Sequence, residues 1–455
     1  MEFNTAIEKR DAIIKGDYSA SENILLFLKT IEKTNPQINA IISVNEKAIE
    51  AAQVVDDKIK RKEKVGKLAG LGIVIKSNIS VDGQNITCAS KTLEDYKGTF
   101  DADVVRAIRD EDGIILGMAN MDEFASGASG ETSAYGRCDN PAAPGMIPGG
   151  SSSGSAASVA ADMCDFSLGT DTGGSIRNPA SHCGVVGIKP SYGRVSRYGL
   201  VDLAMSLDQI GTLANNVTDA GLLLSVIAGH SENDATTVDR GVETYNKFTK
   251  PQNIKIGICP ELKSLCTDDR IWEMIEAKTR KVAAENNWEI KEISLPNVEL
   301  AVQTYYPIVY VEFFSGTRKF DGRKYGKKIE DATGPEVLRR ILGGQEISKA
   351  EYAGRYYRKA LQAKAAIAES IERAFDQVDV IMLPAIPRLP HAFEDEITVD
   401  DMYGYDAFTT AANLAGICAG VVPAGKIDGI PVGLQIMAAA FAERMLFDVM
   451  KAAEE

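Results

Sequence analysis

One lysine and two serines have the types and the order needed for hydrolytic chemistry. Lys76 closes an apolar run, and Ser151 and Ser175 each lie in a stretch rich in glycine and serine. A serine hydroxyl becomes a nucleophile only when a base takes its proton. The base is therefore the first question that the sequence has to answer.

A histidine base is one alternative. The segment 150–154 matches G-x-S-x-G, the nucleophile elbow of α/β-hydrolases, and the chain has 3 histidines, His182, His230 and His391. That elbow also requires an acid and then a histidine at set places after the serine. A five-residue match in so glycine-rich and serine-rich a stretch is weak, so the Ser-His-Asp interpretation is disfavoured.

A lysine base is the second alternative. Lys76 ends the apolar segment 70–76, which predicts a half-buried ammonium at the end of a strand. Burial disfavours the charged form and lowers the pKa from about 10.4. A neutral lysine could then deprotonate a nucleophile through a second serine hydroxyl, or Lys76 could simply mark the end of a strand.

The loop before Ser175 has the composition of an oxyanion site. Thr172, Gly173 and Gly174 precede it directly, and consecutive backbone N–H groups can stabilise the negative charge that develops in acyl transfer. Asp171 and the arginine at position 177 flank the loop, and we expect them to hold it rather than to react.

The full pattern resembles the amidase signature family. The resemblance rests on Lys76, the segment 149–157 and the segment 169–180. The similarity runs from about residue 20 to the C-terminal helix. The resemblance implies that Ser175 forms the acyl intermediate, that Ser151 is a bridging serine next to a cis peptide, and that Lys76 is the base. It also implies an α/β fold with one large domain and a mixed central sheet flanked by helices.

Within that family, five further segments resemble the branch that serves tRNA-dependent amidotransferases. They are 119–124, 187–196, 320–322, 336–341 and 413–416. This resemblance implies a glutaminase subunit of a carbon–nitrogen ligase, which hydrolyses glutamine and passes on ammonia. The ammonia would convert Glu-tRNA(Gln), Asp-tRNA(Asn) or both to the amidated forms.

Glutamine carries an α-carboxylate and an α-ammonium, so a selective pocket needs a fixed cation and a fixed anion. The resemblance assigns these roles to Arg340 and Asp406, and it adds Tyr305 to the substrate site. The other interpretation of these residues is two ordinary surface charges and a core aromatic. The rival functions are a stand-alone amidase acting on another small amide and a non-catalytic scaffold subunit.

The resemblance implies that the chain works in a heterotrimer, with a second subunit that binds tRNA and uses ATP and with a small third subunit. We expect no cofactor in this chain and expect ATP and Mg on the partner, because the segment 70–77 lacks the glycine that a P-loop has before its lysine. No metal is expected either, since His182 and Cys183 are adjacent rather than at ligand spacing.

Three departures from the family pattern concern details of the pocket. Ser153 replaces a glycine, Ser126 stands where bacterial members usually carry methionine, and the loop between positions 322 and 336 is short. These differences suggest the hypothesis of an archaeal-type lineage, and they leave the three reactive residues in place.

The elements that must position these residues alternate between strand and helix, which is typical of an α/β protein. We expect one amidase domain over 1–455, with a helical region at 1–65 and a catalytic core at 66–455. The region 1–65 includes a helix capped by Ser19 or Ser21 and a short β-branched segment at 38–44. The remaining expected strands are 70–76, 113–117, 254–258, 288–293, 378–383 and 429–437, and the expected helices are 45–64, 103–112, 269–286, most of 300–375 and 441–454.

Composition limits the remaining possibilities. The chain has 455 residues, a net charge of −14 and 7 cysteines. The negative charge argues against a surface that itself binds nucleic acid, so any tRNA would be held by the partner. The irregular, odd set of cysteines predicts free thiols, and the absence of a signal sequence or membrane span predicts a cytoplasmic location.

Overall fold

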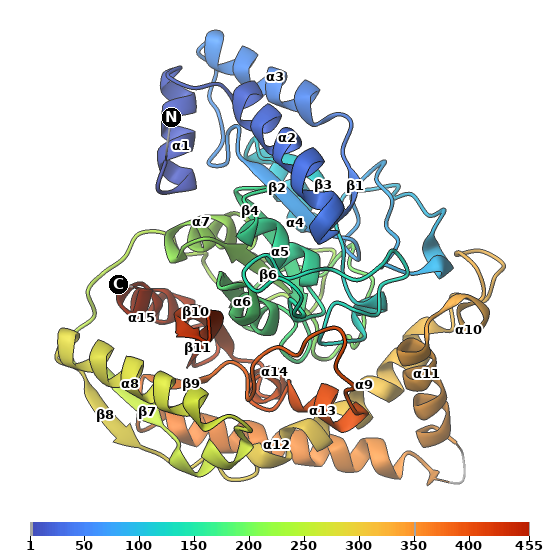
Figure 1. Ribbon diagram of the computed structural model, residues 1–455, viewed down its shortest axis with the longest axis vertical. Coiled ribbons are helices and arrows are strands. Elements are labelled where there is room, and N and C mark those ends of the chain that lie inside the picture. Colours follow the sequence, from blue (N-terminus) through green and yellow to red (C-terminus); the bar gives the residue numbers. More distant parts are fainter. Residues whose placement is uncertain (1–2, 350–351, 455) are drawn as a thin grey trace.

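The computed structural model describes residues 3–349 and 352–454, and it is built around one 11-stranded sheet (Figure 1). The strands are β1 Ile41–Val44, β2 Gly72–Lys76, β3 Ile114–Ala119, β4 Phe166–Asp171, β5 Val186–Lys189, β6 Gln209–Ala214, β7 Lys255–Ile258, β8 Glu289–Glu292, β9 Val380–Pro384, β10 Cys418–Ile427 and β11 Ile430–Ala438. Their order across the sheet is β1-β3-β2-β4-β6-β5-β10-β11-β9-β7-β8. Strand β2 is parallel to β3 and β4, β7 is parallel to β8 and β9, and the other pairs are antiparallel. The expected mixed α/β fold is confirmed.

Helices flank the sheet. They are α1 Ala6–Lys15, α2 Ala20–Ile38, α3 Ala48–Lys60, α4 Asp103–Asp110, α5 Ser153–Ala160, α6 Arg177–Cys183, α7 Val217–Ile227, α8 Asp269–Asn286, α9 Ala301–Thr317, α10 Ile329–Ala332, α11 Pro335–Ile347, α12 Arg355–Phe375, α13 Val399–Gly404, α14 Thr410–Leu414 and α15 Glu443–Glu454. Short 3-10 turns lie at 91–93, 123–125, 260–265 and 298–300.

Strand β2 shows how the sheet separates two cores. Successive side chains of a strand point to opposite faces. Ile73 and Ile75 enter a core shared with α4, α7 and α15, whereas Val74 enters one shared with α2, α5 and α6. Because helices cover both faces, β2 is apolar at every position before Lys76 rather than alternating. A third core joins α9, α11 and α12 at the other end of the molecule (Figure 1).

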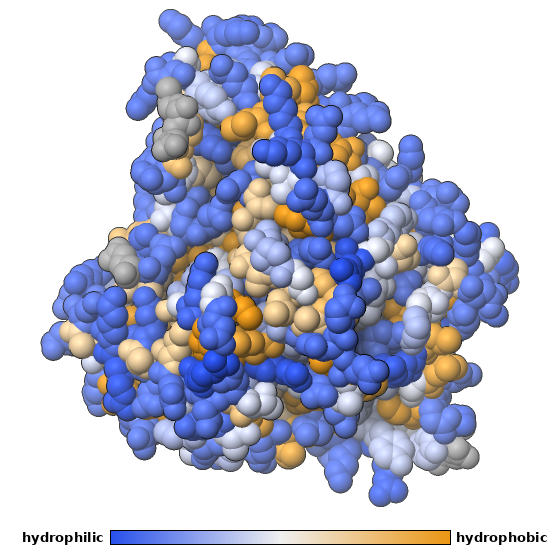
Figure 2. All heavy atoms as spheres, viewed as in Figure 1, coloured by the Kyte–Doolittle hydropathy of each residue, from blue (hydrophilic) through white to orange (hydrophobic). Residues whose placement is uncertain are grey.

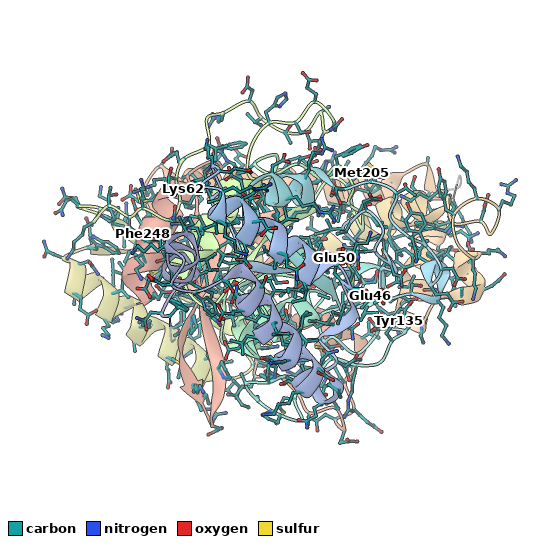
Figure 3. All side chains as sticks on the ribbon, turned by 90° about the horizontal axis from the view of Figure 1, so that it is seen from above. Glu46, Glu50, Lys62, Tyr135, Met205 and Phe248 are labelled. Carbon is teal, nitrogen blue, oxygen red and sulfur yellow. The ribbon has the colours of Figure 1, made fainter. Side chains whose placement is uncertain are left out.

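The N-terminal region is more than a set of helices, because β1 adds a strand to the edge of the sheet beside β3. Helix α2 is capped by Ser19, one of the two serines that the sequence suggests. The structure adds a capping box: Ser19 accepts from the backbone N–H of Glu22, whose carboxylate accepts from the N–H of Ser19. Figure 3 shows α3 running between Glu46 at one end and Lys62 at the other, beside α2.

Most predicted elements occur with small shifts. The helix at 269–286 is confirmed at both ends, and the strand predicted to begin at Gly70 begins at Gly72 because Gly70 is left-handed, with φ +78°. Strands β4, β5, β6 and β10 had no predicted counterpart, since glycine, serine or alanine interrupts their apolar pattern. The short loop between positions 322 and 336 contains the helix α10.

The visible surface is mostly hydrophilic, with scattered apolar side chains (Figure 2). None of the helices in the described ranges is long and apolar enough to cross a membrane. All 7 cysteines are free thiols, as the sequence predicts.

Candidate active site

Strand β2 carries Lys76 into the middle of the molecule. The side chain is fully buried, not half-buried as the sequence suggested. The prediction was wrong because the strand end is covered by segments far away in the sequence, the turn at Ser151 and the end of β4.

Three hydroxyl groups surround the amine of Lys76. Its Nζ lies 2.8 Å from Oγ of Ser151, 2.9 Å from Oγ of Ser152 and 2.8 Å from Oγ1 of Thr170. Burial lowers the pKa of Lys76 to about 7, and the carboxylates of Asp122, Asp171 and Asp208 oppose this shift without cancelling it. A lysine amine with that pKa is a usable base near neutral pH.

The turn that holds Ser151 is built against β2 and the segment after β3. The peptide bond between Gly150 and Ser151 is cis, as the family resemblance implies. The backbone N–H of Asp122 donates to the carbonyl of Ser151 at 3.1 Å. A Cβ on Gly150 would lie 1.9 Å from Oδ2 of Asp122, so only glycine fits beside that carboxylate.

Ser175 follows β4 on a loop that meets the Ser151 turn. The backbone N–H of Ser152 donates to the carbonyl of Ser175 at 3.0 Å, which ties the two loops together. Ser175 keeps 8% of its surface exposed, whereas Ser151 and Lys76 are fully buried. The structure thus brings the three residues into one place, with Ser175 the one that reaches the surface.

The backbone between Thr172 and Ser175 is held on several sides. The hydroxyl of Thr172 donates to Oδ1 of Asp208 at 2.6 Å, and the hydroxyl of Thr409 donates to the carbonyl of Gly173 at 2.6 Å. Gly174 has φ +144°, and a Cβ there would lie 2.2 Å from Oγ1 of Thr409. A loop fixed in this way can keep its peptide groups in place for an oxyanion.

Arg177 anchors the same loop to β11 and to the segment around α14. It forms a buried ion pair with Asp171 at 2.9 Å. Its other donors reach Oε1 of Gln435 at 2.6 Å, Oδ1 of Asn413 at 2.6 Å and the carbonyl of Thr409 at 2.8 Å. Burial alone would raise the pKa of Asp171, but Arg177 overrides this effect and holds the pKa at about 2. The pair therefore stays charged, and its contacts fit the holding role expected from the sequence.

Arg340 and Asp406 come from α11 and from the turn after α13, and Tyr305 comes from α9. All three are buried, with 3%, 8% and 3% of their surfaces exposed. Both charges act on the ring of Tyr305, where burial and Asp406 raise the pKa well above its ordinary value. The ring also lies over the oxyanion loop, since a Cβ on Gly173 would be 2.6 Å from its Cζ atom. The three residues are therefore one cluster beside that loop, and none is an ordinary surface group.

Three further side chains of this cluster were not found from the sequence. Tyr306 donates to Oδ2 of Asp406 at 2.9 Å, and Glu336 accepts from Nε of Arg340 at 2.9 Å. Tyr403 donates to the same oxygen of Glu336 at 3.1 Å. The only sequence signal was position: Tyr306 and Tyr403 lie near assigned residues, and Glu336 begins one of the segments that carried the resemblance.

Two surface grooves adjoin the cluster. One, of about 740 Å³, is lined by Gly127, Glu336 and Met402 among others. The other, of about 590 Å³, has Tyr306 and Tyr403 in its wall. Open space therefore borders the side chains that hold Arg340 and Asp406.

The histidines lie outside this constellation. His230 and His391 hydrogen-bond to other side chains, and His182 is buried with neither ring nitrogen partnered. Within residues 3–349 and 352–454, none of them bonds to Ser151 or Ser175. Across the same residues, no three His, Cys, Asp or Glu side chains gather in a way that could hold a metal ion.

Comparisons with known proteins cover nearly the whole chain. A family model described as Amidase matches residues 22–447. The chain is 51% identical to a glutamyl-tRNA(Gln) amidotransferase subunit of Methanothermobacter thermautotrophicus, over 98% of each sequence. The crystal structure of a glutamyl-tRNA(Gln) amidotransferase subunit from Thermotoga maritima matches with a TM-score of 0.82 at 37% identity, covering 95% of this chain and 91% of that one. The peptide amidase of Stenotrophomonas maltophilia matches with a TM-score of 0.87 at 27% identity, covering 99% and 96%.

Proposed function

Since the chain belongs to the amidase family, we propose that it is the glutaminase subunit of a tRNA-dependent amidotransferase. In this role it hydrolyses the side-chain amide of glutamine and supplies ammonia to convert Glu-tRNA(Gln), Asp-tRNA(Asn) or both. The observation that carries the proposal is the buried pair of opposite charges, Arg340 and Asp406, beside the loop of Ser175. An amide without charged α groups has no use for such a pair.

The proposed reaction begins on Ser175. Its Oγ attacks the amide carbon of glutamine, and its proton passes through the hydroxyl of Ser151 to the neutral amine of Lys76. The oxyanion accepts hydrogen bonds from the backbone of Thr172, Gly173 and Gly174. Collapse of the tetrahedral intermediate breaks the C–N bond, and the leaving nitrogen takes the proton back along the relay and departs as ammonia.

The glutamyl ester on Ser175 is then cleaved by water. The relay through Ser151 to Lys76 takes a proton from the water, its oxygen bonds to the acyl carbon, and Oγ of Ser175 leaves with a returned proton. Glutamate is the second product. One relay therefore serves both halves of the reaction.

Three groups hold the substrate in this proposal. Arg340 donates only its Nε hydrogen bond within the described residues, so its two amino groups form a free fork for the α-carboxylate. Oδ1 of Asp406 likewise has no donor among those residues and accepts from the α-ammonium. Tyr305 forms the wall between this pair and the oxyanion loop.

The chain acts with partners in this proposal. A second subunit binds the charged tRNA and uses ATP and Mg to activate its carboxylate, and a small third subunit completes a cytoplasmic heterotrimer. The net charge of −14 supports this division, because phosphate contacts require clustered lysine and arginine. The whole of 1–455 serves as one amidase domain.

The experiment that tests the proposal uses the chain co-expressed with candidate partners. The purified complex should convert Glu-tRNA(Gln) or Asp-tRNA(Asn) with glutamine as donor. Ser175→Ala should abolish this activity and leave conversion with free ammonium intact. Loss of both activities in a folded complex would contradict the transfer of ammonia between subunits.

A stand-alone amidase is the second candidate, because the peptide amidase of Stenotrophomonas maltophilia has a similar fold. It predicts activity of the isolated chain on neutral amides. Arg340→Leu separates the two: it should abolish glutamine hydrolysis under the first proposal and spare neutral amides under the second.

A further inference from the structure

The side chains behind Arg340 and Asp406 are joined to one another. On one side, Glu336 accepts from Nε of Arg340 at 2.9 Å and from the hydroxyl of Tyr403 at 3.1 Å, through the same oxygen. On the other side, the hydroxyl of Tyr306 donates to Oδ2 of Asp406 at 2.9 Å. Each charged group is thus held by one partner.

The two partners meet through their aromatic rings. The rings of Tyr306 and Tyr403 are stacked, with centroids 3.7 Å apart and planes 16° from parallel. The hydroxyl of Tyr310 lies 2.7 Å from that of Tyr403 and fixes the outer end of the stack. The guanidinium of Arg340 lies 5.5 Å from the ring centre of Tyr306 and 6.0 Å from that of Tyr403, within the range of a cation–π contact.

This arrangement leaves the outward-facing groups free. Glu336 occupies the Nε edge of Arg340, and Tyr306 occupies one oxygen of Asp406. Among residues 3–349 and 352–454, no other side chain or carbonyl accepts from Arg340, and no other side chain or N–H donates to the side chain of Asp406. The amino fork and Oδ1 can therefore meet a ligand without breaking a protein contact.

Glu336 also weakens the binding of a ligand that carries a carboxylate but no ammonium group. Its carboxylate already compensates the charge of Arg340, so a carboxylate alone gains less from that site than from a bare guanidinium. A ligand with an ammonium group as well gains a second contact at Asp406. The rigid stack makes the spacing between the two contacts a fixed property of the protein.

We propose that Glu336, Tyr403 and Tyr306 form one positioning unit that couples the cation receptor to the anion receptor, and so restricts the site to α-amino acid amides. The proposal rests on the function proposed above and names what sets its selectivity. Movement at Tyr403 is passed to Arg340 through Glu336 and to Asp406 through the ring of Tyr306.

Tyr403→Phe tests the coupling in the purified complex, because it keeps the ring and removes the hydroxyl. The assay measures ammonia release from glutamine and from two analogues, 4-carbamoylbutanoate, which lacks the α-ammonium, and 4-aminobutanamide, which lacks the α-carboxylate. We expect the KM for glutamine to rise about tenfold, the effect of losing one charge-assisted hydrogen bond, with kcat within about twofold. The kcat/KM of both analogues should fall.

Independent receptors would give a different result. The Tyr403 hydroxyl, the only group that Tyr403→Phe removes, bonds to Glu336 and not to Asp406; the backbone bond from the N–H of Asp406 to the carbonyl of Tyr403 is unchanged. An uncoupled site would therefore lose activity on 4-carbamoylbutanoate alone, and that outcome overturns the proposal. An unchanged KM for glutamine overturns it too. A wild-type complex that fails to hydrolyse glutamine contradicts the proposed function instead, which keeps the two failures apart.

Tyr357→Phe is the matched control. Tyr357 lies on α12, outside the unit. Its hydroxyl also donates to a carboxylate, Oε1 of Glu312, at 3.0 Å. It should leave all three substrates unchanged, and a change equal to that of Tyr403→Phe would show a general effect of the substitution and refute the coupling. A double-mutant cycle of Tyr306→Phe and Glu336→Gln gives a second measurement: coupling predicts non-additive effects on KM, and additive effects refute it.

Discussion

Lys76 should make glutamine hydrolysis depend on pH in a way that its surroundings define. Its pKa is lowered from 10.5 to about 7 by complete burial, a shift that corresponds to about 5 kcal/mol of disfavoured ammonium. The base form is neutral, so about one tenth of the protein is active at pH 6 and about nine tenths at pH 8. We expect kcat to fall about tenfold for each pH unit below 7 and to level off above it.

Asp406 titrates in the same pH range, and its effect on the rate differs from that of Lys76. Burial raises the pKa of Asp406 to about 7, although Tyr306 and Arg340 lower it. Its ionised form, which holds the ammonium, is lost as the pH falls, so KM should rise below pH 7. At saturating glutamine the bound ammonium keeps Asp406 ionised, and kcat then reports Lys76.

The measurement is ammonia release between pH 5.5 and 9 at several glutamine concentrations, with circular dichroism at each pH to confirm folding. Asp406→Asn should remove the pH dependence of KM and keep that of kcat. Lys76→Met should reduce kcat by a factor of about 10² to 10⁴, the contribution of a general base. A kcat that is flat from pH 5.5 to 8, or a near-normal rate in Lys76→Met, would refute the assignment of Lys76 as the base.

Two further predictions concern the loop of Ser175, the proposed nucleophile. Arg177→Met should lower the free energy of unfolding by about 3–5 kcal/mol, because it leaves Asp171 buried without its counter-charge; urea denaturation measures this, and a loss below about 1 kcal/mol would contradict the anchoring role. Gly174→Ala should abolish glutamine hydrolysis, since the new Cβ would lie 2.2 Å from Oγ1 of Thr409. Gly241→Ala, with no atom within 4 Å of its Cβ, is the control and should keep full activity; full activity in Gly174→Ala would show that the loop is not constrained.

The two serines of the proposed relay could be picked out from the sequence because their signal is local. Ser151 and Ser175 each lie in a short motif in which neighbouring glycines stand where the backbone has no room for a side chain. The fold class was equally accessible, since buried strands such as 72–76 read as continuous apolar runs between helices. These features depend on neighbours in the chain, which is what a single sequence displays.

What the sequence could not show depends on contacts between distant segments. The complete burial of Lys76 comes from hydroxyls 75 to 94 positions away. Tyr306 has the pattern of a core aromatic on a helix, and only its contact with Asp406, 100 positions later, gives it another role. A strand such as β10 is equally hidden, because its pairing with β5 and β11 replaces the missing apolar pattern.

The contacts of Arg177 also have a consequence for how the chain folds during its synthesis. This side chain ties the loop of Ser175 to Asn413, 236 positions later, and to Gln435, 258 positions later. Both partners leave the ribosome long after the serine itself. An unfinished chain keeps the pair of Arg177 with Asp171 but lacks these two later contacts. We therefore expect the loop of Ser175 to reach its final geometry only after β11, the last strand in the chain, has been made.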